Sequence, residues 1–259
     1  MKLRKSLCIF AAFLLLLLTG CSKAPEEDVT WYMKEDIRTF FAVQTTLYVY
    51  EYNEDWSTGS ITVYENGEML GTITYEHTEN GYITRDGDDV TEVIYTKDEA
   101  GNATHTENYL NGQLSSTTDC TFDDNGNMLT YDTYLVEPEM HLHQQTEYNA
   151  QGNKVRMTID NGYTTSVTEY TYDSQGRLKT ESNPDSNSRT EYRYTDSGKV
   201  QTALSYDGTG ELTGKSVTTY DEYGNALLQE SFDAEGNLVM SSARSYISTD
   251  GRTSSGISG

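Results

Sequence analysis

The repeating unit of the chain is clearest at Phe122-Asp123-Asp124-Asn125-Gly126-Asn127-Met128-Leu129. Each main position has a plain structural use. The aromatic ring packs at the end of a strand, the first aspartate caps a tight turn, the glycine takes the left-handed backbone conformation, and the leucine begins the return strand. The stretch therefore predicts a hairpin between two antiparallel strands.

The same pattern recurs along the chain. Further copies lie at 148–155, 172–178, 206–212, 220–227 and 232–238, with looser copies starting at Tyr95, Tyr194 and Tyr246. Between them, pairs such as Asn66-Gly67 and Asn111-Gly112 mark further reversals, so that turns follow one another about every twelve residues. Subtracting the turns leaves strands of roughly eight residues. Thr, Tyr and Val dominate these segments, as is typical of half-buried strands.

These copies resemble the YD-repeat, or Rhs-like, family over about residues 90–252. The resemblance implies hairpins that pair side by side into a long, curving sheet. Because a sheet of many twisted strands cannot stay flat, the predicted fold is an all-β antiparallel meander curved into an open roll, a half-barrel or a barrel. Large members of the family enclose a toxic cargo. Here the final residues are expected to form only a flexible tail, so toxin delivery is not predicted.

The N-terminus has the pattern of an export signal. Lys2, Arg4 and Lys5 precede an apolar run from Cys8 to Leu18, which is too short for a transmembrane helix. The run ends in Leu18-Thr19-Gly20-Cys21, which resembles the lipobox of bacterial lipoproteins. This resemblance implies cleavage before Cys21 and lipidation of its thiol. The membrane is thus the first expected partner, reached through the lipid on Cys21.

This reading gives four segments. Residues 1–20 are predicted to be a removed signal peptide, 21–30 an acidic spacer, 31–252 a single β-repeat domain, and 253–259 a flexible tail. Within the domain, residues 31–42 fit neither a helical nor a strand period well, so they are expected to form either a short helix or the first strand.

Charge and composition exclude some classes of partner. The chain carries 41 acidic and 18 basic residues, for a formal net charge of −23, so nothing neutralises the phosphates of a nucleic acid. Of its three cysteines, Cys8 lies in the signal and Cys21 in the lipobox, which leaves Cys120 without a disulfide partner. The fold must therefore be held by strand pairing and packing.

Rows of tyrosines are the candidate ligand-binding residues. Alternation along a strand places the members of each row on one face, where rings could stack against sugars or peptides. The rows comprise Tyr48, Tyr50 and Tyr52, then Tyr170 and Tyr172, then Tyr192 and Tyr194. The simpler interpretation, which we favour, is that these rings pack the sheet through cross-strand contacts.

One set of residues could hold a divalent metal, and no catalytic motif stands out. Glu139, His141 and His143 would share one face of a strand and belong to ligand types that zinc uses, but no further ligand can be placed, so a pair of solvent-facing histidines is the favoured interpretation. No cofactor is otherwise expected. The sequence lacks the usual serine hydrolase, zinc protease and phosphate-loop motifs.

These observations predict a lipid-anchored extracytoplasmic lipoprotein with a non-catalytic scaffold or ligand-binding role at the cell envelope. It would sit on the outer face of the cytoplasmic membrane, or at the outer membrane of a cell that has one. The first alternative is a carbohydrate-binding surface module that uses the tyrosine rows, and the second is an enzyme of unknown specificity. A cell-wall, glycan or protein partner would fit either the scaffold or ligand-binding lipoprotein or the carbohydrate-binding module.

Overall fold

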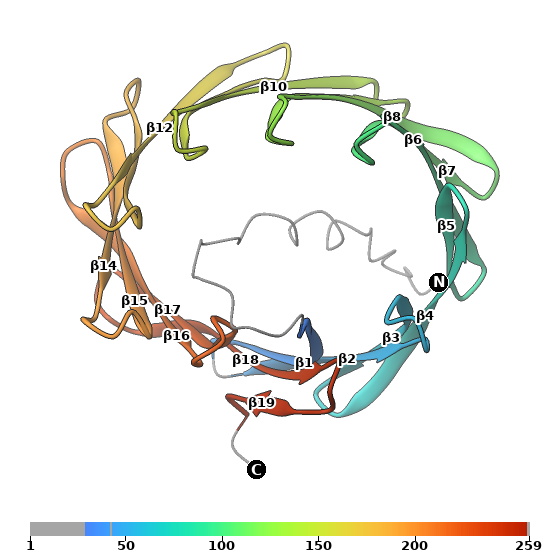
Figure 1. The fold of residues 1–259 in the computed structure, drawn as a ribbon. Helices are drawn as coiled ribbons and strands as arrows, with labels where there is room; N and C mark the ends of the chain where they lie inside the picture. Colours follow the sequence, from blue (N-terminus) through green and yellow to red (C-terminus); the bar gives the residue numbers. More distant parts are fainter. Residues whose placement is uncertain (1–28, 42, 258–259) are drawn as a thin grey trace, which may run out of the picture.

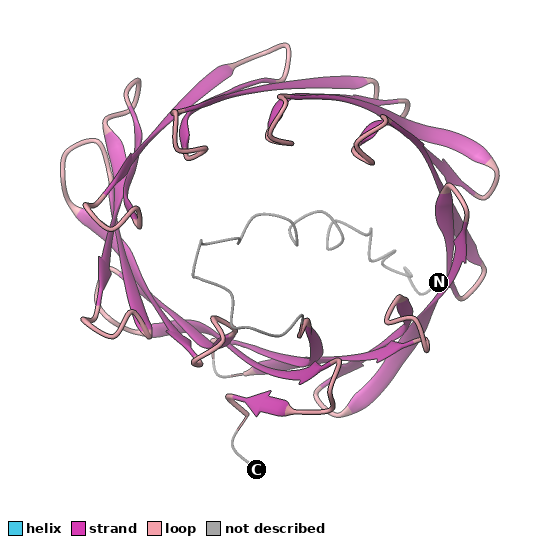
Figure 2. Ribbon diagram, viewed as in Figure 1, coloured by secondary structure: helices cyan, strands magenta, loops and turns pink. Residues whose placement is uncertain are grey.

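The computed structural model describes residues 29–41 and 43–257, which form strands and turns with no helix among them (Figures 1 and 2). The strands are β1 (Trp31–Phe40), β2 (Gln44–Tyr52), β3 (Thr58–Glu65), β4 (Glu68–Thr78), β5 (Gly81–Asp86), β6 (Asp89–Lys97), β7 (Ala103–Leu110), β8 (Gln113–Phe122), β9 (Met128–Leu135), β10 (Met140–Tyr148), β11 (Lys154–Asp160), β12 (Thr165–Tyr172), β13 (Leu178–Asn183), β14 (Ser188–Tyr194), β15 (Val200–Tyr206), β16 (Leu212–Tyr220), β17 (Ala226–Asp233), β18 (Leu238–Ser248) and β19 (Thr253–Ser255). The predicted all-β class is confirmed.

Every strand pairs antiparallel with its neighbours in sequence, and β1 also pairs with β18. That last pairing closes strands β1 to β18 into a barrel, seen end-on as a ring in Figure 1. The antiparallel meander is therefore confirmed, and of the three predicted curvatures the structure adopts the barrel. The first segment, left open between helix and strand, is strand β1.

The C-terminal strand β19 pairs with the last part of β18. One edge of β18 pairs with β1, and the other edge pairs first with β17 and then, past the start of β17, with β19. Residues 253–255 thus pair with the domain, where the sequence predicted a tail. Side-chain and backbone bonds hold this segment, because Ser254 Oγ donates to Asp221 Oδ2 at 2.6 Å and Gly256 N donates to Arg244 O at 2.9 Å.

The two ends of the barrel carry different connections. We call the end where β1 begins the entry rim and the end where β1 finishes the far rim. Most five-residue loops of the repeat lie at the entry rim, among them 98–102, 123–127 and 173–177, whereas most two-residue turns, such as Asn66-Gly67, lie at the far rim. In Figure 2 several loops curl towards the inside of the ring, and others flare outward.

The loop at 123–127 shows how the repeat forms its turn. Asp123 Oδ1 accepts the backbone N–H groups of Asn125 and Asn127 at 2.9 and 2.8 Å, and Asn127 Nδ2 donates to Oδ2 at 2.8 Å. These bonds hold the pKa of Asp123 below its ordinary value. Gly126 has φ of 80°, a conformation that side chains disfavour, which explains the fixed glycine.

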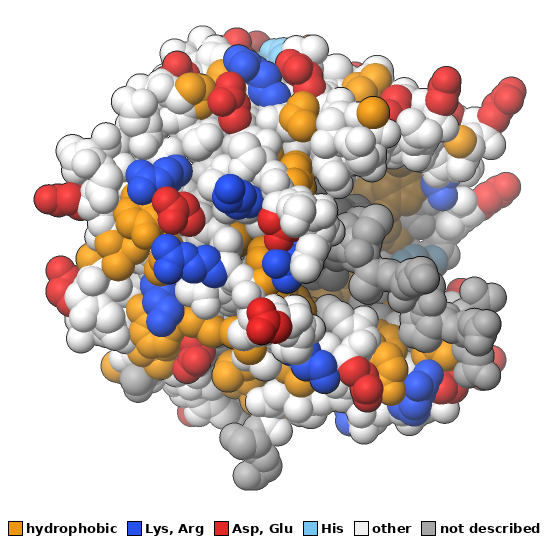
Figure 3. Space-filling model, turned by 60° about the vertical axis from the view of Figure 1, so that its left-hand side comes forward, with side chains coloured by type: hydrophobic (Ala, Val, Ile, Leu, Met, Phe, Trp, Pro, Cys, Tyr) orange, Lys and Arg blue, Asp and Glu red, His pale blue; other side chains and the backbone are white. Residues whose placement is uncertain are grey.

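Alternation divides the wall into two faces, and we assign the more buried one, which carries most of the tyrosines, to the concave inside. The outer face carries charges, and Figure 3 shows Lys, Arg, Asp and Glu side chains scattered over the outer wall. Among the described residues, Val93 and Tyr170 are the only hydrophobic residues that are almost fully buried, with 6% and 8% of their surface exposed. The barrel thus has a solvated wall in place of a conventional hydrophobic core.

Candidate functional site

The predicted tyrosines lie on the inner wall in two separate groups. Tyr48, Tyr50 and Tyr52 lie on β2, whereas the other four lie on β12 and β14, across the ring (Figure 1). The register places all seven on the same face of the sheet. The strands of one group therefore do not neighbour those of the other, and the seven residues do not form one site.

The β2 group is embedded in other aromatic rings. Tyr52 lies 5.2 Å from Tyr32 and 6.3 Å from Trp56 between ring centroids, and its hydroxyl donates to Met33 O at 2.6 Å. Burial is the main cause that raises the pKa of Tyr50 to about 12. These rings are packed into the wall to an extent that limits stacking on a ligand.

Tyr48, on the same strand, has a cation over its ring. The Arg38 guanidinium lies 4.9 Å from the ring centroid. A sugar stacking on that face of Tyr48 would have to displace Arg38.

Two of the four rings in the β12 and β14 group also have a cation over them. Lys154 Nζ lies 4.3 Å from the Tyr170 centroid, and the Arg177 guanidinium lies 4.5 Å from the Tyr194 centroid. Burial lowers the pKa of Lys154 and raises that of Tyr170 to about 12. Cation–π contacts of this kind stabilise the wall and occupy the ring faces that a carbohydrate needs.

Glu181 on β13 lies between these tyrosine strands. Burial is the main cause that raises the pKa of Tyr192. The negative charge of Glu181 and a hydrogen bond between Tyr192 and Glu181 raise this pKa further. Glu181 also partly offsets the lowering of the Lys154 pKa. An acid, a base and two tyrosines thus face the lumen together, an arrangement that can hold polar groups.

A repeated hydrogen bond joins successive repeats, and the sequence analysis missed it. In each case a tyrosine at or near the end of one strand donates its hydroxyl to a backbone carbonyl at or near the start of the strand that precedes it in the chain. The donor–acceptor pairs are Tyr52–Met33 at 2.6 Å, Tyr148–Met128 at 3.0 Å, Tyr172–Lys154 at 2.7 Å, Tyr194–Leu178 at 2.9 Å and, from within β18, Tyr246–Ala226 at 3.0 Å. The available signal was the preference for tyrosine over phenylalanine at this position of the repeat.

The three predicted metal ligands do not come together as a set. His141 and His143 share the outer face of β10, as alternation predicted, and both face Asp132 on β9, with His141 Nε2 and His143 Nδ1 at 3.3 and 2.6 Å from Asp132 Oδ1. Burial works to raise the pKa of Asp132, but the two histidine bonds hold it below its ordinary value. Glu139 lies in the loop before the strand.

Among residues 29–41 and 43–257, no group of three or more His, Cys, Asp and Glu side chains is arranged to hold a metal ion. The metal site therefore stays a prediction. Cys21, the predicted lipidation site, lies outside the described residues. In the described part of the chain, no helix has the length and hydrophobicity needed to cross a bilayer.

Comparison with known proteins supports the repeat and the barrel. The RHS Repeat family model matches residues 148–188, so the repeat is present in that segment. A solved structure of a porin-like protein from Bacteroides uniformis ATCC 8492 is 13% identical, with a TM-score of 0.50, and the match covers 82% of this chain and 96% of that one. At this identity the likeness shows the barrel fold alone.

A second solved structure, TcdB2-TccC3-Cdc42, is 10% identical with a TM-score of 0.30. The match covers 81% of this chain but only 14% of that chain. No curated protein matches the sequence. The chain is thus defined as an antiparallel β-barrel that carries an RHS repeat.

Proposed function

We propose that the protein is a lipid-anchored, extracytoplasmic barrel with a non-catalytic scaffold role at the cell envelope. The observation that carries this proposal is the use of the repeat residues themselves. The repeat aspartates bond within their loops, the tyrosine hydroxyls bond neighbouring repeats, and cations cover several of the rings. Residues so engaged stabilise a wall and are poorly available for catalysis.

The proposed anchor fits the geometry of the barrel. Val29, the first described residue, precedes β1 at the entry rim and follows Cys21 by eight residues. Eight extended residues reach at most about 29 Å. A lipid on Cys21 would therefore hold the entry rim near the membrane, and the far rim would be the exposed end.

The anchor is tested by comparing the wild type with Cys21→Ala in the native host. We expect wild-type protein to partition into the detergent phase and to carry the mass of a diacylglyceryl group, and the variant to show neither property. Cys120→Ala is the matched control, because Cys120 is a half-buried free thiol in β8. Unmodified Cys21 in the wild type would overturn the anchor.

Carbohydrate binding at the inner wall is the second candidate. It is favoured by the face of the wall that carries the tyrosines, where neighbouring groups such as Thr168 and Thr190 can bond sugar hydroxyls. Cell-wall and storage glycans should then change the tyrosine fluorescence of the wild type, and Tyr192→Ala should abolish the change. Tyr163→Ala is the control, since Tyr163 is 88% exposed at the far rim. No response to any glycan leaves the scaffold role as the better account.

A further inference from the structure

The far rim concentrates the exposed apolar surface of the barrel. Thirteen of the fourteen exposed large hydrophobic residues in the described chain lie in, or within three residues of, the far-rim turns; these are Phe40, Phe41, Val43, Met69, Leu70, Leu110, Leu114, Tyr134, Val136, Met140, Tyr163, Leu212 and Leu238. The remaining one, Ile94, lies within β6. None lies at the entry rim. Exposed apolar side chains concentrated at one rim offer surface to an interaction partner.

The charge of the far rim is of one sign. Among the described residues, the nine far-rim turns and the strand residue on either side of each contain no Lys or Arg and thirteen acids, which are Glu65, Glu68, Asp86, Asp88, Asp89, Glu137, Glu139, Asp160, Asp185, Asp207, Glu211, Asp233 and Glu235. The entry rim differs, because the same positions there include bases such as Lys97, Lys199 and Arg252. The far rim is therefore both apolar and acidic.

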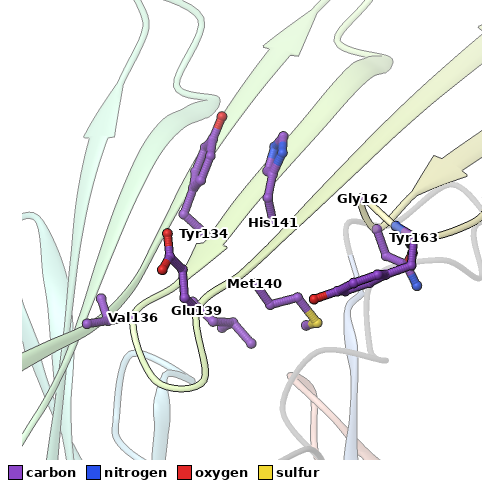
Figure 4. A pocket seen from close by; sticks show the side chains of 9 residues that line it. Tyr134, Val136, Glu139, Met140, His141, Gly162 and Tyr163 are labelled. Atoms are coloured by element: carbon purple, nitrogen blue, oxygen red, sulfur yellow. Dashed lines mark hydrogen bonds between the residues drawn. The ribbon is translucent and has the colours of Figure 1, made fainter.

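The apolar and acidic groups meet in a hollow of about 850 Å³ between the β9–β10 and β11–β12 loops (Figure 4). Val136, Met140 and Tyr163 supply apolar surface, and Tyr163 lies across the hollow from Met140. Glu139 also lines the hollow. Glu137, two residues earlier in the same loop, carries a second carboxylate. A hollow of this kind fits an apolar side chain flanked by a cation.

We propose that the far rim is a docking surface for a polypeptide partner whose contact segment alternates apolar and basic residues, with the hollow between the β9–β10 and β11–β12 loops as its anchor point. Charge selects this partner over two others. An anionic bilayer is repelled by the thirteen carboxylates, and a second copy docking rim to rim would oppose the same acids to one another. A basic, apolar segment satisfies both features of the rim. The proposal does not depend on the scaffold role.

The test uses full-length protein and two defined probes, a labelled peptide of alternating leucine and lysine and the same peptide with glutamate for lysine. We expect only the lysine peptide to bind, as measured by fluorescence anisotropy. Two double variants should each weaken binding about tenfold or more, or roughly 1.4 kcal/mol. The apolar variant combines Val136→Ser with Tyr163→Ser, and the charge variant combines Glu137→Gln with Glu139→Gln. The charge variant removes no apolar side chain and so should fold like the wild type. Its binding therefore decides the outcome if the apolar variant folds poorly.

The matched control is Glu99→Gln with Asp124→Asn, two exposed loop acids of the entry rim. This variant should leave the affinity within about twofold. Equal weakening by the entry-rim and far-rim charge variants would show diffuse attraction to an acidic protein and overturn the proposal.

Two further results would overturn it in favour of another occupant. The first is flotation of the Cys21→Ala chain with phosphatidylcholine vesicles that is lost when Val136 and Tyr163 become serine, which would assign the rim to a bilayer. The second is a concentration-dependent dimer in sedimentation velocity that the same two substitutions abolish, which would assign it to a second copy.

Discussion

The tyrosine and aspartate of each repeat do different work in the wall. The aspartate bonds backbone N–H groups within its own loop, as Asp173 does with Gln175 and Arg177 at 2.9 Å each. The tyrosine acts between repeats, because its hydroxyl reaches a carbonyl that follows the turn of the preceding repeat, as Tyr172 does with Lys154 O. One residue thus forms the hairpin, and the other sets each hairpin against the one before it. The first role was predictable from turn chemistry, whereas the second needed the register.

Replacing Tyr172 with Phe should therefore loosen one junction between repeats. The change removes the hydroxyl that donates to Lys154 O at 2.7 Å and leaves the ring in place. We expect the free energy of unfolding to fall by about 1 kcal/mol, the usual net worth of such a bond, as measured by urea denaturation. Tyr163→Phe is the control, since this tyrosine is 88% exposed and should give no change. A similar loss in both variants would contradict the assigned role.

At the scale of the strand, turn chemistry predicted most of the fold. Pairs such as Asn66-Gly67 do form turns with positive φ at both residues, and the segments between turns are strands. Strand alternation also placed His141 and His143 correctly on one face. It failed for Glu139, because the strand starts only at Met140 and the preceding residue belongs to the loop. The partner of the histidines, Asp132, follows from register, which a single strand does not carry.

The tyrosine strands should make the barrel sensitive to alkali. Burial raises the pKa values of Tyr50, Tyr95 and Tyr170 to about 12, so the folded state favours the neutral phenol. A pKa raised on folding stabilises the protein fully below the unfolded value of about 10, and this stabilisation is lost as pH rises towards the folded value. We expect the urea midpoint to fall between about pH 10 and 12.

Absorbance at 295 nm should then show part of the tyrosines ionising late, or only as the protein unfolds. The guanidine-unfolded chain is the control, where all tyrosines should titrate together near pH 10. Ionisation of every tyrosine near pH 10 in a barrel that stays folded would contradict the burial of the rows.

At the scale of the whole molecule, closure was the feature that the sequence left open. The repeat specifies pairing between neighbours, and it holds equally in a roll, a half-barrel or a barrel. Closure instead depends on β1 and β18, about two hundred residues apart, and β1 carries no copy of the repeat. Asp36, which lies at this seam, is one of 41 acidic residues, and nothing in its local sequence separates it from the others.

The seam is held by a buried charge network centred on Asp36. This side chain has 0% exposure and accepts bonds from Ser242 Oγ at 2.6 Å and Arg38 Nε at 2.8 Å, while Arg244 Nε lies 3.7 Å away. Arg244 Nε is buried with no hydrogen-bond acceptor among the described residues, so Asp36 supplies the counter-charge for both arginines. Removing one partner of such a network leaves uncompensated charge in the wall.

Asp36→Ala should accordingly destabilise the barrel by about 3–5 kcal/mol in urea denaturation, the cost typical of breaking a buried ion pair. Amide hydrogen exchange should accelerate first in β1 and β18, because they lose the contact that joins them, and later in the central hairpin of β8 and β9. Glu76→Ala is the control: its pair with Arg85 is exposed at 65% and 51%, so its loss should change stability by less than about 1 kcal/mol. If exchange instead rises evenly around the ring, the barrel does not open at this seam, and the ladder between β1 and β18 is held by its backbone bonds alone.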